Sequence, residues 1–282
     1  MTVTHPLLAE AAAMETSEAQ CTADTLDALR RFFTESIDRS LKGASVTFEA
    51  AVGKPEQEIL RMARERHADL IVISSHGLTG FRKLFFGSTT ERVLRETSVP
   101  VLIVPGDDRG PGSVAEAAPG VRRILAPVLL PPVSGGHLAV VRAIAETLAA
   151  PALLLHVVEP LRAVLPHSDR YLAKVERERR LRAEVELEQL AAGAGGAKPE
   201  ALIAYGEPSE EIVKVARDRR VGLIVMGLQS SPEGGAHIGS VTYRVLCAAG
   251  RPVLALPARA AAGNFPQAEK KAARQQAAGK SK

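Results

Sequence analysis

Short apolar runs alternate with longer amphipathic stretches along most of the chain. In the second half this pattern predicts strands at 123–128, 151–158, 201–205, 222–226 and 252–256, and helices at 136–149, 169–191, 209–218 and 241–247. Strands that alternate with helices favour a parallel sheet with helices on both faces. The uninterrupted apolar run at 223–226 agrees, because a strand buried on both sides has no polar face. We therefore expect an α/β fold with a doubly wound parallel sheet.

The first half shows only the later part of that plan. Its pattern predicts helices at 25–41, 55–66 and 88–96, and strands at 45–51, 68–74 and 99–104.

The two halves are copies of one unit. At an offset of 153, residues 53–59 (GKPEQEI) recur as 206–212 (GEPSEEI). After a one-residue deletion the offset is 152, which places Gly87-Ser88 on Gly239-Ser240. We expect two tandem doubly wound domains: an incomplete one at 1–107, a linker at 108–119, a complete one at 120–258, and a disordered tail at 259–282.

The beginning of the first unit has no counterpart. By the internal match, residues 2–7 fall where 156–161 stand, so the unit's first strand, first helix and much of its second strand are missing. Either translation starts upstream of Met1 or the first domain is a truncated remnant. The first strand of a doubly wound sheet is usually central, so its loss leaves a gap that another segment, or another chain, would have to fill.

Composition narrows the function classes. The 282 residues, 46% hydrophobic and 24% charged, suit two globular domains, and no membrane span or secretory signal is visible, so we expect a cytoplasmic protein. Cys21 and Cys247 lie in different halves without metal-like spacing. The formal charge of +4 is spread among acids, and the chain has no Trp, so we expect neither specific nucleic-acid recognition nor a membrane partner.

The candidate chemistry follows the strand at 68–74. Two residues separate Ser74 from Gly77, and nine more separate Gly77 from Gly87-Ser88 at the start of a helix. This spacing resembles the G-x2-G-x9-G-S/T pattern of the universal stress protein family, with Ser74 in place of the first glycine. The resemblance covers nearly the whole chain. It implies a Rossmann-like fold of the adenine nucleotide alpha hydrolase type, a regulatory or protective role in stress rather than an enzymatic one, and ATP or AMP as the possible ligand.

A phosphate needs glycines that let it approach the backbone, and a helix N-terminus whose free N–H groups attract anions. The residues that fit such a cofactor site are Ser74, His76, Gly77, Gly87, Ser88 and Thr89. Two alternatives stay open. Ser88 and Glu91 have the spacing of a capping box, which would satisfy the helix without a ligand, and a lone loop histidine such as His76 is more often structural.

The second copy departs from the family pattern. The resemblance implies an Asp just after the first strand, at the adenosine, where this chain has Leu129. Its second loop reads Gly227-x2-Ser230, followed by eight residues instead of nine before Gly239, and it carries Glu233. We therefore expect the second copy not to bind ATP. His156 and His237 have no ligand neighbours, so no metal site is predicted.

The last strand of each unit should form an apolar sheet edge, and such edges tend to pair. Members of the resembled family likewise dimerise through this strand. The two copies could therefore pair within one chain or form a homodimer. Two hypotheses of function remain: an adenine-nucleotide-responsive module and a ligand-free scaffold for dimerisation and partner docking.

Overall fold

The computed structural model describes residues 2–4, 18–36, 45–74, 87–105, 121–130, 135–161, 169–230 and 236–257. Its helices are α2 (Glu18–Ser36), α3 (Pro55–Glu65), α4 (Ser88–Glu96), α6 (Gly135–Leu148), α7 (Asp169–Gly193), α8 (Pro208–Asp218) and α9 (Ser240–Ala248). Its strands are β1 (Thr2–Thr4), β2 (Ala50–Val52), β3 (Ile71–Ser74), β4 (Val101–Val104), β5 (Ile124–Pro127), β6 (Ala152–Val158), β7 (Glu200–Tyr205), β8 (Leu223–Gly227), β9 (Gln229–Ser230), β10 (Ala236–His237) and β11 (Val253–Leu256). The expected linker at 108–119 and tail at 259–282 lie outside the described residues.

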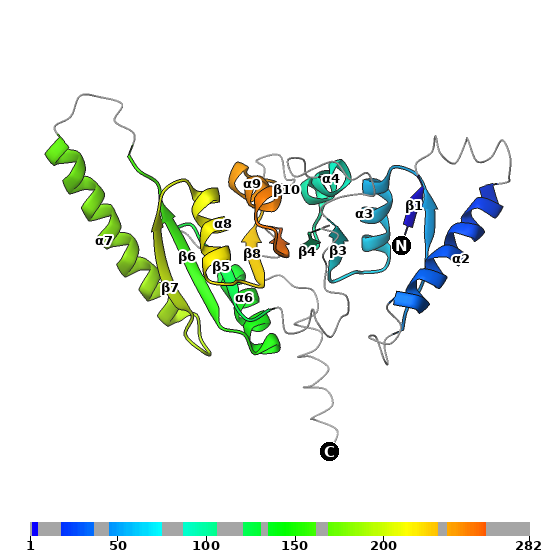
Figure 1. Cartoon of the computed structure of the whole chain (residues 1–282), viewed down its shortest axis with the longest axis horizontal. Coiled ribbons are helices and arrows are strands. Elements are labelled where there is room, and N and C mark those ends of the chain that lie inside the picture. The colour runs from blue at the N-terminus through cyan, green and yellow to red at the C-terminus, as the bar shows by residue number, and fades with distance from the viewer. Residues whose placement is uncertain are drawn as a thin grey trace, which may run out of the picture.

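Strands of both units form one seven-stranded sheet in the order β3-β4-β11-β8-β5-β6-β7 (Figure 1). Every neighbouring pair in it is parallel except β4 and β11, which are antiparallel. The α/β fold and mostly parallel sheet are as predicted, and the strands of the two units belong to one continuous sheet. The physical reason is that the apolar last strands of the two units pair with each other, which is the intramolecular one of the two pairings that the sequence allowed.

The seven-stranded sheet has apolar side chains on both faces. One cluster joins α3 and α4 of the first unit to α8 and α9 of the second, through residues such as Leu60, Val93, Ile212 and Val245. The other cluster lies on the opposite face and packs α6 and α7 against the second unit's strands. Helices therefore cover both faces of the sheet in the second unit, as a buried parallel sheet requires.

The remaining described strands form two small sheets. β9 pairs antiparallel with β10, and β1 pairs parallel with β2, so that Thr2 lies opposite Ala50. In the second unit the corresponding residue, His156 of β6, lies opposite Ile203 of β7. β1 is thus the end of the unit's second strand, where the repeat placed it.

Element bounds in the second unit agree with the sequence pattern within two residues, whereas three elements of the first unit differ by more. The strand predicted at 68–74 is β3, which begins only at Ile71. The helix predicted at 25–41 is α2, which begins at Glu18 and has a side-chain hydrogen bond from Gln20 to Asp24 in its first turns (3.0 Å). The strand predicted at 45–51 is only the three-residue β2, because its one partner, β1, pairs with it over three residues. Local pattern cannot set the length of a strand whose partner is short.

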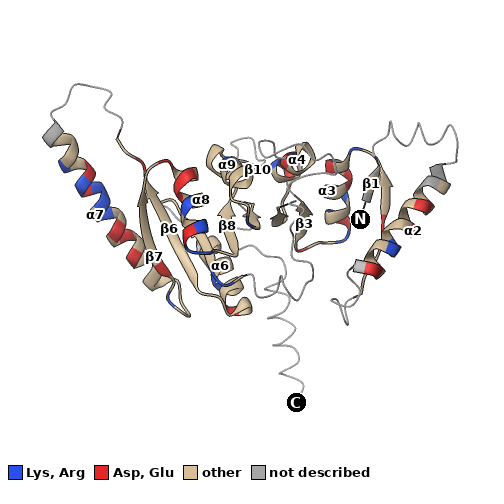
Figure 2. Ribbon diagram, in the orientation of Figure 1, with Lys and Arg blue, Asp and Glu red and all other residues tan. Residues whose placement is uncertain are grey.

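Charged side chains run along α7 (Figure 2). Lys174 and Glu178 lie 3.9 Å apart on it, and the Arg180 guanidinium stacks 4.0 Å from the ring centre of Tyr205 on β7. α7 thus packs one side on the sheet and presents charge on the other. None of the helices in the described ranges is long and apolar enough to cross a membrane.

Candidate functional site

The site begins where β3 ends. The Thr90 hydroxyl donates a hydrogen bond to the main-chain carbonyl of Ser74 (3.1 Å), and Thr90 itself is buried. This bond ties the first turn of α4 to the carboxyl end of β3. In open α/β sheets, ligands bind at the carboxyl ends of strands, so the described part of the motif lies where such a ligand would be held.

No side chain of the described residues caps the N-terminus of α4. Gly87 is the N-cap residue, with φ −58° and ψ 132°, and it has no side chain that could accept a hydrogen bond from the helix start. Ser88 is exposed and Thr89 is half-buried. Because the first backbone N–H groups of a helix lack partners within it, and the helix dipole adds partial positive charge there, this end can receive an anion.

The capping-box alternative is wrong. Ser88 is the first residue inside the helix and not the N-cap, and the Glu91 carboxylate pairs with Arg95 one turn later (2.7 Å). Neither side chain therefore pairs with the free backbone N–H groups at the start of the helix, as the side chains of a capping box do. The backbone carbonyl of Gly87 accepts from the N–H of Glu91, which opens the ordinary helical ladder (3.0 Å).

An ion pair holds α4 against α3. Arg92 on α4 donates to the buried Glu56 carboxylate on α3 (2.9 Å). Hydrogen bonding to its own backbone N–H, supported by Arg92, lowers the pKa of Glu56 below its ordinary value. The second unit has an equivalent pair, Arg244 with Glu207 (3.0 Å), although its carboxylate comes from two positions earlier in the repeat.

The structure brings together four of the six residues predicted for the site: Ser74 at the strand end, and Gly87, Ser88 and Thr89 at the helix start. His76 and Gly77 lie outside the described residues, so their part in the site stays a prediction.

In the second unit a buried histidine, His137, lies beside the corresponding strand end, and the sequence analysis missed it. His137 lies in the first turn of α6, and its Nδ1 is 3.8 Å from where a β-carbon on Gly227 would be. Gly227 is the counterpart of Ser74 in the repeat. Only 5% of His137 is exposed, and its Nε2 has no hydrogen-bond partner among the described residues. The sequence feature that could have pointed to His137 is a histidine among apolar residues at the start of the helix predicted at 136–149.

His137 adds no positive charge for a phosphate. Burial lowers its pKa to about 4, so the imidazole is neutral at pH 7. After β5, Leu129 is exposed in place of a carboxylate. His156 is structural, since its Nδ1 hydrogen-bonds with the carbonyl of Val128 (2.9 Å). Within the described ranges, no cluster of His, Cys, Asp or Glu could hold a metal ion.

A model of the universal stress protein family matches residues 2–105 and 120–257. The chain belongs to the universal stress protein family. Two universal stress proteins of Methanocaldococcus jannaschii are similar to it: one is 36% identical over 72 residues, and the other 39% over 62. These matches cover 25% and 22% of this chain and 44% and 36% of the relatives, so the chain spans less than half the length of these two relatives.

Solved structures of similar fold cover most of this universal stress protein. A functionally unknown protein from Pseudomonas aeruginosa has 19% identity and a TM-score of 0.58, over 83% of this chain and 77% of that one. A universal stress protein from Archaeoglobus fulgidus has 19% identity and a TM-score of 0.53, over 82% of this chain and 80% of that one. At this identity they show the fold, and their coverage agrees with a tandem arrangement of two units.

Proposed function

We propose that this universal stress protein has a regulatory or protective role in stress and that its first unit binds an adenine nucleotide, ATP or AMP. In this proposal the phosphates lie against the N-terminus of α4, where Gly87 allows close approach and Ser88 and Thr89 offer hydroxyl donors. Ser74 forms the floor at the end of β3, and His76 and Gly77, which lie outside the described residues, remain predicted members of the site.

The observation that carries the proposal is the uncapped N-terminus of α4 beside the end of β3. A helix start placed at the carboxyl end of a parallel strand, with a glycine as its N-cap, is well suited to bind an anion. The second unit favours no such role, because His137 lies over Gly227 as a neutral, buried side chain.

The variant Gly87→Asp tests the site directly. Aspartate is a preferred N-cap residue, and at Gly87 the backbone is not in the left-handed region, so the change should keep or improve helix stability. Its carboxylate would occupy the N–H groups that a phosphate needs and repel the phosphate charge. Gly239→Asp is the matched control, because Gly239 is the N-cap of α9 in the second unit.

The measurement is mass spectrometry of small molecules released when freshly purified protein is denatured, together with calorimetric titration of ATP and AMP. We expect nucleotide with the wild type and with Gly239→Asp, and none with Gly87→Asp. No release from the wild type, and no binding of added nucleotide at millimolar concentration, would leave the ligand-free scaffold as the better hypothesis. Loss of binding in both variants would place the nucleotide elsewhere.

A further inference from the structure

A cavity of about 390 Å³ lies in the second unit between α6, the start of β6 and the turn at 194–199 that follows α7. Val141 and Leu154 line it and are buried in the core. Ala145 and Ala152 also line it and are only partly buried. Close-packed protein interiors leave few voids larger than a water molecule, so an apolar space of this size is a candidate binding site.

Small side chains leave this space open. The alanines that line it are Ala145, Ala149, Ala150, Ala152, Ala194 and Ala197. At about 30 Å³ for each heavy atom, the volume that a water molecule takes in the liquid, the cavity holds about a dozen heavy atoms. It lies at the amino-terminal end of β6, opposite to the strand ends beside which His137 and Gly227 lie. The cavity is thus separate from the position that corresponds to the nucleotide site.

Two glycines shape the turn that closes one side of the cavity. Gly195 and Gly196 have φ +71° and +67°, in the left-handed region that favours glycine. A β-carbon at Gly195 would lie 2.7 Å from Nη1 of Arg142, and one at Gly196 would lie 2.8 Å from Oε1 of Glu146. The glycines therefore let these two side chains of α6 lie directly against the turn.

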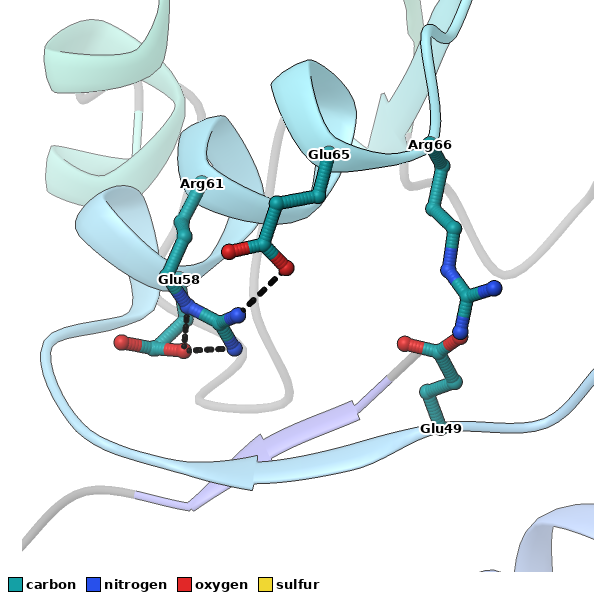
Figure 3. Close-up of polar contacts among 5 residues, drawn as sticks. All are labelled: Glu49, Glu58, Arg61, Glu65 and Arg66. Carbon is teal, nitrogen blue, oxygen red and sulfur yellow. Dashed lines mark hydrogen bonds and ion pairs between the residues drawn. The ribbon is translucent and has the colours of Figure 1, made fainter.

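The guanidinium of Arg142 has only a loose partner. Its Nε lies 3.9 Å from the carboxylate of Glu146, four residues further along α6. Arg61 on α3 has a glutamate at the same spacing, but there the guanidinium bonds closely to Glu65 and to Glu58, each at 2.7 Å (Figure 3). Among the described residues, none accepts a hydrogen bond from Arg142. Its N–H groups are therefore available to water or to a ligand.

The other charged residues that line the cavity limit the charge of such a ligand. Lys198 pairs with Glu188 at 2.8 Å, so it is already neutralised. Glu146 would repel a ligand that carries two negative charges. A guanidinium binds a carboxylate through two parallel N–H···O bonds. The group that fits beside Arg142 is therefore a single carboxylate.

We propose that this cavity binds a small amphipathic carboxylate, of the class of medium-chain fatty acids. The apolar body lies against Val141 and Leu154, and the carboxylate binds Arg142. Burial of the apolar body supplies the affinity, and the guanidinium selects the charge of the head group. The site is independent of nucleotide binding, because it lies in the other unit and shares no residue with the site at α4.

The experiment titrates decanoate, which has about a dozen heavy atoms, into the full chain by calorimetry below the micelle concentration. We expect a dissociation constant of about 10–100 µM. Hydrogen–deuterium exchange of residues 194–198 should become about tenfold slower at saturation. Decylammonium is the matched ligand. It has the same alkyl chain and the opposite charge, so it should bind about tenfold more weakly or less.

Arg142→Met tests the contact with the head group, since it keeps an unbranched apolar side chain and removes the charge. Decanoate should bind to this variant about tenfold more weakly, and its advantage over decylammonium should disappear. Arg217→Met is the matched control, because Arg217 is exposed on α8 and does not line the cavity. It should bind both ligands as the wild type does.

Ala197→Phe tests the cavity itself. Ala197 is exposed in the turn, so a phenyl ring can fill the cavity while the thermal melting stays close to wild type, and decanoate binding should be lost. The control is Ala192→Phe, at an exposed position of α7 that does not line the cavity. This variant should bind decanoate normally.

Several results would overturn the proposal. They include no binding of decanoate at millimolar concentration, equal binding of decylammonium, and unchanged binding by Arg142→Met or by a normally melting Ala197→Phe. Binding only after removal of residues 259–282 would show that the chain's own end covers the cavity. A dimer by light scattering, broken by Ala197→Phe, would show that a second copy fills it.

Discussion

Leu102 lies directly opposite Leu254, its own counterpart in the repeat, at the centre of the pairing between β4 and β11. On either side of it, Val101 faces Ala255 and Ile103 faces Val253. Val101 thus faces the counterpart of Ile103, and Ile103 faces the counterpart of Val101, which is the exchange of contacts seen in a twofold dimer interface. The chain thus joins its two units by a pseudo-twofold contact inside one continuous sheet.

This contact should be measurable as a coupling energy. Leu254 is buried, so Leu254→Ala should lower the free energy of unfolding by about 2–5 kcal/mol. Leu102→Ala should cost less, because Leu102 is only partly buried. We expect the double variant to deviate from additivity by about 0.5 kcal/mol or more, as contacting residues do. Urea unfolding of the four proteins measures this.

A control cycle pairs Leu102→Ala with Val158→Ala on β6, several strands away in the sheet. These two changes should add. If Leu102 and Leu254 were also additive, the two units would not be held by this pair of strands in solution.

His137 should make the protein less stable in mild acid. Its pKa is about 4 in the folded protein and 6.5 in an ordinary environment. Between these values the unfolded chain takes up a proton that the folded chain does not, so stability falls as pH drops from 6.5 to 4 and this contribution is constant below 4. At about 1.4 kcal/mol per pKa unit, the loss is at most about 3.5 kcal/mol.

His137→Leu removes this proton uptake. Urea unfolding between pH 7 and 4 should show a flatter decline in the variant than in the wild type. Val141→Ala, a change in a neighbouring buried position of α6, is the control: it should lower stability at every pH and keep the wild-type slope. A wild-type slope in His137→Leu would show that the imidazole is not buried in neutral form.

The two units cap equivalent helices differently. In the second unit Glu207 is the N-cap of α8 and accepts a hydrogen bond from the N–H of Glu210 (2.9 Å). The Ser209 hydroxyl, the largest influence, lowers the pKa of Glu207. In the first unit Lys54 is the N-cap of α3, and its side chain caps nothing. Glu207 therefore provides a side-chain cap for α8, whereas Lys54 provides none for α3, so a capping residue at position 54 should stabilise the first unit.

We expect Glu207→Ala to lower the unfolding free energy by about 1 kcal/mol, and Lys54→Asp to raise it by about 0.5–1 kcal/mol. Chemical denaturation compares both with Lys54→Ala, which removes the same charge without adding a cap. Equal stability of Lys54→Asp and Lys54→Ala would mean that the aspartate does not reach the helix N–H groups.

The sequence predicts the second unit well because its local signals are strong. Pro208 marks the start of α8, and apolar runs mark strands such as β8 that are buried on both faces. The repeat then transfers this plan to the first unit and even to β1, whose register with β2 matches that of β6 with β7.

Long-range contacts account for what the sequence could not predict. The single sheet depends on which edge strands pair with each other. Edge strands have similar apolar sequences, so the sequence does not show which of them will pair. The spacing of Ser88 and Glu91 fits a cap, but Glu91 prefers Arg95 at one helical turn. The neutral state of His137 follows only from its burial against the end of β8, which no local pattern records.

The antiparallel pairing of β4 and β11 also makes the two ends of the sheet, along the strand direction, different from each other. Since chain direction reverses there and nowhere else in the sheet, β3 and β8 point in opposite directions, and their carboxyl ends lie at opposite ends of the sheet along the strand direction. The start of α4 lies at one of these ends, and His137, beside the end of β8, lies at the other. No single small ligand can reach both. A nucleotide bound at the start of α4 would therefore lie at only one of these two ends. A binding protein could distinguish the two ends by whether a nucleotide is present.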